Sequence, residues 1–122
     1  MTSQWTTTAL GRIGETIAAA YLELQGFNVV ARNLRRGRRE VDLVARRGDL
    51  TCIVEVRLRR RGRYGSAVET LSPAKRARMW SAASELAVRC GGILRCDVIA
   101  IDWAPEKGLE LVHIVDALHS GR

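Results

Sequence analysis

Polar and apolar residues alternate along two neighbouring segments of the chain, residues 40–44 and 53–57. A period of two is typical of a β-strand that turns one face toward a core. Gly48 and Asp49 lie between the two segments, and a two-residue loop that begins with glycine suits a type II′ hairpin turn. The pattern therefore predicts a β-hairpin from Arg39 to Leu58.

This turn predicts which side chains meet across the hairpin. It places Asp42 opposite Glu55, and Glu40 opposite Arg57, with all four side chains on one face of the sheet. The other face takes Val41, Leu43, Val54 and Val56. Like charges that face each other across a ladder destabilise it, so the two acids require a positive partner.

The rest of the chain divides into helices, strands and basic loops. Apolar residues at three- and four-residue spacing predict a helix that starts at Thr6–Thr8 and ends at Gly26, and Ser72-Pro73 to Gly91-Gly92 predicts a second helix. The apolar stripe of the first helix consists of Leu10, Ile13, Ile17, Tyr21 and Leu24. Further strands are predicted at 27–31, 93–101 and 109–114, with basic loops at 33–38 and 59–71. The result is a single α/β domain over residues 1–122, in the order α-β-β-β-α-β-β, with a central mixed sheet flanked by helices.

The chain carries a net charge of +7, and its arginines are concentrated around the hairpin. Such a distribution favours nucleic acid as the partner over a merely solvated basic face or an acidic protein. The two flanking clusters are Arg32, Arg35, Arg36, Arg38, Arg39, and Arg57, Arg59, Arg60, Arg61, Arg63.

Several residues are expected to be structural. No apolar run approaches the ~20 residues that span a bilayer, and the first residues lack the layout of a signal peptide, so we expect a cytoplasmic protein with no membrane partner. Cys52 and Cys96 fall in predicted strands without zinc-ligand spacing, which indicates buried free thiols. Arg95 and Asp97 lie on one strand face and are expected to form a structural pair near the sheet edge or the margin of the site. His113 is expected to be a packed strand histidine and not a ligand.

Short motifs along nearly the whole chain resemble the UPF0102 (YraN-like) family of the restriction-endonuclease-like superfamily. The matching stretches are Gly11-x-x-Gly14-Glu15, Arg32-Asn33-x-Arg35, Glu40-Val41-Asp42-Leu43, Val54-Glu55-Val56-Arg57, Tyr64-Gly65, Lys75 and Arg95-x-Asp97-Val98. The resemblance implies a restriction-endonuclease-like fold that carries a PD-(D/E)xK nuclease motif on the hairpin, and it favours DNA over RNA as the nucleic-acid partner.

The same resemblance implies roles for individual residues. Asp42 and Glu55 match the metal-binding acids, Arg57 occupies the position of the motif lysine, and Glu15 matches an additional metal-site acid. Carboxylate ligands of this kind suit Mg²⁺ or Mn²⁺. The expected nucleic-acid-binding residues are Arg35, Arg36, Arg38, Arg39, Arg59, Arg60, Arg61, Arg63 and Lys75.

Two of these positions raise a physical question. Glu15 lies about 160° around the helix from the apolar stripe, so it reaches the site only if the helix packs on two sides, as Ala18 and Leu22 permit. Arg57 stays protonated and cannot accept a proton as a lysine can. Lys75 is an alternative source of an amine.

The sequence thus leaves three functions open. The first is a metal-dependent endonuclease acting on structured or branched DNA, and the second is a catalytically silent nucleic-acid-binding module derived from a nuclease. The third is an interaction protein that uses its basic loop on an acidic partner. A separate alternative is that Asp42 and Glu55 are only solvated strand acids neutralised by nearby arginines. Related junction resolvases dimerise, so a homodimer is also left open.

Overall fold

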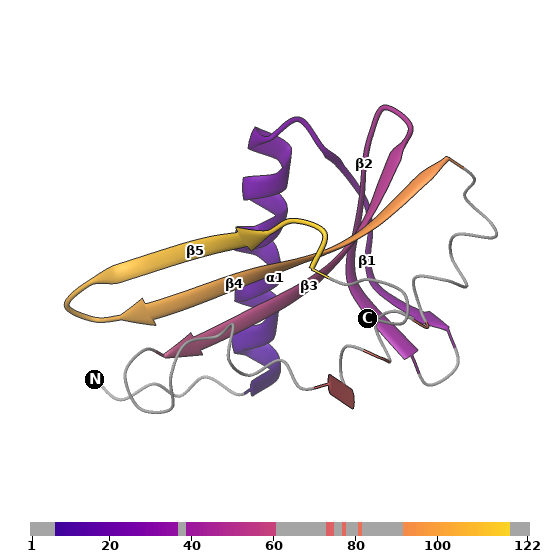
Figure 1. Cartoon of the computed structure of the whole chain (residues 1–122). Helices are drawn as coiled ribbons and strands as arrows, with labels where there is room; N and C mark the ends of the chain where they lie inside the picture. The colour runs from indigo at the N-terminus through magenta and orange to yellow at the C-terminus, as the bar shows by residue number, and fades with distance from the viewer. Residues whose placement is uncertain are drawn as a thin grey trace.

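A five-stranded sheet and one long helix form the framework of the described part of the chain (Figure 1). The computed structural model describes residues 7–36, 39–60, 73–74, 77, 81 and 92–117. The elements are α1 (Thr7–Leu24), β1 (Asn28–Arg36), β2 (Arg39–Arg47), β3 (Leu50–Arg60), β4 (Ile93–Ala104) and β5 (Gly108–Ile114). Helix α1 lies across one face of the sheet in Figure 1.

The sheet is mixed, as the sequence predicts. Its strands follow the order β1-β2-β3-β4-β5, and β3 and β4 are parallel whereas the other three neighbouring pairs are antiparallel. Parallel strands need a long crossover connection, and the predicted second helix falls in this connection. Residues 73, 74, 77 and 81 are helical, and the rest of that helix lies outside the described residues.

The hairpin between β2 and β3 has the predicted turn and the predicted register. Of the two turn residues only Gly48 has a positive φ, of 61°, as a type II′ turn requires. The ladder runs from the pair Arg47 and Leu50 to the pair Leu43 and Val54. The next pair in this register would be Asp42 with Glu55, and the ladder ends just before it.

Helix α1 uses the predicted face only in part, because Ile17 and Tyr21 of the stripe pack against the core but are only partly buried. Its fully buried residues are Ala18, Ala19 and Leu22, whereas Leu24, at the end of the predicted stripe, is 85% exposed. Small side chains let the helix axis approach the sheet closely. The close packing gained in this way outweighs the gain from burying the larger stripe residues more fully. Glu15 precedes Ala18, Ala19 and Leu22 by three, four and seven positions. It therefore lies at the margin of the side of the helix that faces the sheet.

Gly14 lies where α1 closely approaches β3 of the sheet. A Cβ built on Gly14 would lie 3.2 Å from the Cβ of Leu58, whereas one on Gly11 meets no described atom within 4 Å. Replacing a helical glycine by alanine stabilises a helix by about 1 kcal/mol.

We therefore expect Gly11→Ala to raise the free energy of unfolding by about 0.5–1 kcal/mol. Gly14→Ala should lose that gain to crowding against Leu58, and Gly14→Val should be destabilising. Urea unfolding of the three variants measures the difference. Equal gains from alanine at both positions would contradict the close approach.

Two hydrophobic clusters cover the two faces of the sheet. The cluster on the α1 face contains Leu43 and Val54, and the cluster on the other face contains Val41, Val44 and Ile53. The prediction that Val41 shares a face with Leu43 is therefore wrong. Strand β2 departs from strict alternation at Asp42, the residue between them.

Strand β1 is longer than predicted. It continues from Asn28 to Arg36, where a strand ending at residue 31 and a basic loop from residue 33 were expected. The extension follows from pairing, because Leu34 and Arg35 lie opposite Val41 and Glu40 in β2. Cross-strand pairing satisfies the backbone here despite the run of polar side chains. Strands β3 and β4 likewise extend to Arg60 and Ala104.

Candidate functional site

Asp42 is anchored at the point where the ladder between β2 and β3 ends. Its Oδ2 accepts a hydrogen bond of 2.9 Å from the backbone N–H of Val56, the residue between Glu55 and Arg57. An ionised acceptor makes this bond stronger than one between neutral groups. The first acid of the predicted motif is thus fixed directly against the backbone of the second.

Glu55 and Arg57 contact each other along β3. The Nη1 atom of Arg57 lies 3.4 Å from Oε2 of Glu55, whose side chain is only 5% exposed. A buried carboxylate requires such compensation, so this contact supplies positive charge to Glu55.

The predicted pairing of Glu40 with Arg57 is not the arrangement in the structure. Glu40 instead lies opposite Arg35 in β1, with 3.9 Å between Oε2 and the arginine Nε. Both side chains are well exposed, so this ion pair contributes little stability. The ladder between β2 and β3 ends before it reaches Glu40, which leaves Glu40 to pair with β1.

Glu15 joins this region from α1. Its Oε1 accepts a hydrogen bond of 3.1 Å from Nδ2 of Asn33 in β1. Burial raises the pKa of Glu15 above its ordinary value of 4.5, and the charges of Asp42 and Glu40 raise it further, against the hydrogen bond from Asn33 and the charge of Arg32. Asp42 and Glu40 are therefore close enough for their charges to act on Glu15.

This raised pKa predicts a pH-dependent stability. Glu15 contributes stability below pH 4.5, where it is protonated in both states, and loses that contribution as the pH rises through its folded-state pKa. Glu15→Gln should therefore be more stable than the parent at neutral pH, and this advantage should shrink on acidification. Urea unfolding from pH 4 to pH 7.5 measures it, and a constant difference across that range would contradict the pKa shift.

The predicted nucleic-acid-binding residues are only partly described. Arg35 is exposed beside Glu40, and the guanidinium carbon of Arg60 lies 5.3 Å from the ring centre of Trp103. Arg59 is half-buried on β3. Arg36 and Arg39 occupy strand ends whose side chains are not described. Arg38, Arg61, Arg63 and Lys75 lie outside the described residues, as does Tyr64.

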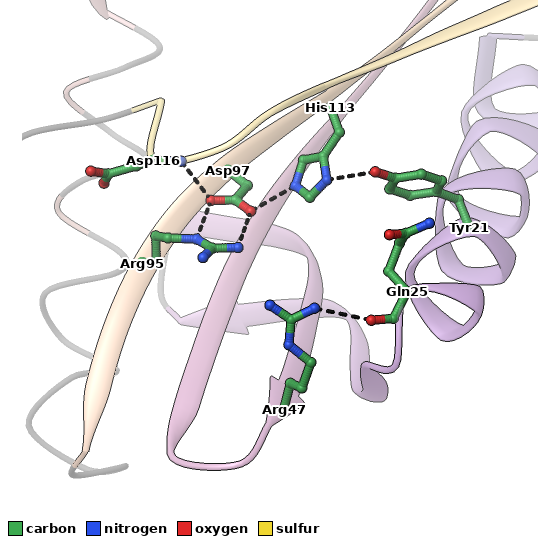
Figure 2. Close-up of polar contacts among 7 residues, drawn as sticks. All are labelled: Tyr21, Gln25, Arg47, Arg95, Asp97, His113 and Asp116. Atoms are coloured by element: carbon green, nitrogen blue, oxygen red, sulfur yellow. Dashed lines mark hydrogen bonds and ion pairs between the residues drawn. The ribbon is translucent and has the colours of Figure 1, made fainter.

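A second polar cluster lies between β4, β5 and α1 (Figure 2). The Asp97 carboxylate, fully buried, accepts two hydrogen bonds of 2.9 Å from Arg95, one of 2.7 Å from Nε2 of His113 and one of 2.9 Å from the N–H of Asp116. The Nδ1 atom of His113 lies 2.8 Å from the Tyr21 hydroxyl. Because an ionised carboxylate only accepts, Nε2 of His113 carries a proton.

This cluster is structural, as the sequence predicts for Arg95, Asp97 and His113. Burial alone would raise the pKa of Asp97, but the hydrogen bonds from Arg95 and the Asp116 N–H, with those from Cys52 and His113, hold it below the ordinary value of 3.8. Cys52 and Cys96 are buried free thiols, and burial raises the pKa of Cys96 to about 12. Neither thiol is therefore reactive near neutral pH.

The acids of the hairpin have the donor chemistry of a magnesium or manganese site, because carboxylate oxygens are the ligands that these ions prefer. Within the described part of the chain, however, no three His, Cys, Asp or Glu side chains gather into a group that could hold a metal ion. A metal here would need water and phosphate oxygens to complete its shell, which is the usual situation for Mg²⁺.

A helix packed on a five-stranded mixed sheet, with paired acidic motifs on its central hairpin, is consistent with the restriction-endonuclease-like class of α/β domains. A family model described as "Uncharacterised protein family UPF0102" matches residues 14–101. The chain belongs to this family, as its motifs predict.

Individual relatives agree along most of the chain. It is 46% identical over 98 residues to a UPF0102 protein of Anaeromyxobacter dehalogenans, and the matched region covers 78% of this chain and 73% of that protein. It is 37% identical over 108 residues to one of Leifsonia xyli, at 86% and 92% coverage. It is also 35% identical over 114 residues to one of Symbiobacterium thermophilum, at 91% and 97% coverage.

Two features of the site were not predicted from the sequence. The first is the hydrogen bond between Asn33 and Glu15, which places the Arg32-Asn33-x-Arg35 motif next to one of the acids. The second is the link from Asp97 through His113 to Tyr21 on α1. An asparagine within a strand can indicate a left-handed backbone conformation. The neighbouring sequence, however, does not indicate which residue the asparagine side chain contacts.

None of the helices in the described ranges is long and apolar enough to cross a membrane.

Proposed function

We propose that this chain binds nucleic acid and carries a divalent-metal-dependent endonuclease-type site that acts on structured or branched DNA. The observation that supports the proposal most directly is the hydrogen bond from the Val56 N–H to Asp42. It joins the two acidic motifs of the hairpin at the end of their shared ladder. The family motifs on these same residues support the same function.

In this proposal the acids and the arginines have different tasks. Asp42 and Glu55 would hold Mg²⁺ or Mn²⁺ together with water and phosphate oxygens, and Glu15 would add its negative charge from α1. When bound, such an ion polarises a phosphate oxygen and lowers the pKa of a bound water. The exposed arginines hold the phosphate backbone without reading the bases.

Arg57 serves as a fixed positive charge. Its contact with Glu55 orients the guanidinium along β3, and its side chain is 27% exposed, so that a phosphate group has access to it. A guanidinium stabilises the charge that develops on a phosphate oxygen. Because Arg57 stays protonated, the proton of the attacking water passes to bulk water or to the phosphate.

The test is incubation of the purified protein with linear, flapped and four-way-junction DNA of one sequence, with Mg²⁺, Mn²⁺ or EDTA. We expect strand scission of the branched substrates in the presence of metal and none in EDTA. Binding to all three substrates without scission would exclude the endonuclease.

A catalytically silent nucleic-acid-binding module is the second candidate, and the arginine at position 57 favours it. This function predicts salt-sensitive DNA binding that does not change on addition of metal and that survives neutralisation of Asp42. A crystal soaked in Mn²⁺ separates the two, because anomalous density between Asp42 and Glu55 is expected only of the metal site.

A further inference from the structure

Asn33 has an unusual backbone conformation for the interior of a strand. Its φ is 51°, in the left-handed region, although β1 continues on both sides of it. A side chain in this region strains the backbone, and asparagine is among the residues that tolerate it best. Strained residues of this kind occur preferentially at functional sites.

The conformation of Asn33 coincides with a break in the neighbouring strand. The register pairs Arg32 with Leu43, and Leu34 with Val41, which puts Asn33 opposite Asp42. Ala31 and Leu34 pack on the same face of the sheet although they are three residues apart. Regular alternation would place them on opposite faces, so β1 is interrupted between them.

Strand β2 shows the same interruption. Val41 and Val44 are also three residues apart and also pack on one face. The two breaks stand side by side, one at Asn33 and one at Asp42. The sheet is thus locally reshaped where β1 and β2 approach Glu15 of α1.

We propose that Asn33 is a positioning residue of the candidate site: its left-handed backbone and its side-chain amide together hold the Glu15 carboxylate beside Asp42. The role of the positioned acids in binding a metal rests on the proposed function. The positioning itself rests on the structure, where Nδ2 of Asn33 donates a 3.1 Å hydrogen bond to Oε1 of Glu15 at the strand break.

The chemistry explains why asparagine occupies this position. Glycine adopts the left-handed region but has no side chain that can donate a hydrogen bond. Arginine or lysine would donate, but each would neutralise the Glu15 charge by direct pairing. A neutral amide orients the carboxylate and leaves its negative charge available to a cation.

Three variants separate the parts of this role. Asn33→Gly keeps the backbone conformation and removes the amide, whereas Asn33→Ala removes the amide and strains the backbone. Asn28→Gly is the matched control, because Asn28 is an exposed asparagine at the start of the same strand. The first readout uses metal-free protein, and the second uses Mn²⁺ alone.

In metal-free protein, the side-chain amide signals of Asn33 in a ¹⁵N–¹H spectrum should shift on Glu15→Ala, while those of Asn28 stay in place. Unchanged Asn33 signals would overturn the proposal. Asn33→Ala should also unfold at a lower urea concentration than Asn33→Gly, and equal midpoints would overturn the role of the left-handed backbone.

With Mn²⁺ followed by electron paramagnetic resonance, Asn33→Gly should weaken binding about tenfold, the lower range for loss of an outer ligand partner, and Asn28→Gly should not change it. Equal Mn²⁺ affinity in the parent and in Asn33→Gly would overturn the proposal and leave the proposed function intact. If the parent binds no Mn²⁺ but the Asn33 amide responds to Glu15→Ala, the proposed function fails and the positioning of Glu15 by Asn33 stands.

Discussion

Asp42→Asn is expected to reduce metal-dependent DNA cleavage by about a hundredfold or more, since loss of about 3 kcal/mol of transition-state stabilisation has this effect. The substitution removes the negative charge that holds the metal. It keeps an oxygen acceptor for the Val56 N–H, so the junction of the two motifs should survive. Initial rates on the best branched substrate, at saturating Mg²⁺, measure the loss.

The control for this variant is Asp49→Asn, which makes the same change at an exposed turn residue of the same hairpin. It should cleave at the parent rate. DNA binding in EDTA should be equal for all three proteins, which shows that the loss lies in the reaction and not in the fold. Parent-like cleavage by Asp42→Asn would exclude Asp42 as a metal ligand.

The hairpin shows how much of the fold the sequence determines locally. Gly48 and Asp49 specify a type II′ turn, and this turn sets the register from residue 50 to residue 54. Turn chemistry is a local property, so it is readable from the sequence. The prediction is confirmed up to the last pair before Asp42.

Beyond that pair, the arrangement depends on contacts between segments far apart in the chain. The break at Asp42 occurs opposite Asn33, and Asn33 in turn contacts Glu15, 18 residues earlier. Periodicity cannot reveal such a break, because it assumes that each strand is regular. Regular alternation therefore predicts the wrong face for Val41 and the wrong cross-strand partner for Glu40.

The orientation of α1 illustrates a related limit. The hydrophobic pattern gives most weight to large residues, but the helix is positioned by Gly14, Ala18 and Ala19, which allow close contact with the sheet. This contact places Glu15 near Asp42 and Glu40, a proximity that the apolar stripe does not predict. Close packing is a property of two surfaces and is not encoded in one of them alone.

Asp97→Ala is expected to lower the free energy of unfolding by about 3–5 kcal/mol, the usual cost of removing one partner of a buried ion pair. The substitution leaves the Arg95 guanidinium and Nε2 of His113 without their acceptor. It also cuts the connection of β4 to Tyr21 on α1 (Figure 2). Urea unfolding followed by circular dichroism measures the loss.

Asp49→Ala serves as the control, and a loss for Asp97→Ala within about 0.5 kcal/mol of that exposed-site variant would contradict the network. Asp97→Asn keeps the shape of the side chain if the alanine variant does not fold. Because the folded-state pKa of Asp97 is lowered, its charge stabilises the parent above pH 3.8 and ceases to do so as the pH falls through that folded-state pKa. The stability advantage of the parent over Asp97→Asn should therefore shrink on acidification. For Glu15→Gln it is the advantage of the variant over the parent that should shrink. One pH series of unfolding measurements thus distinguishes Asp97, whose charge stabilises the fold, from Glu15, whose charge destabilises it.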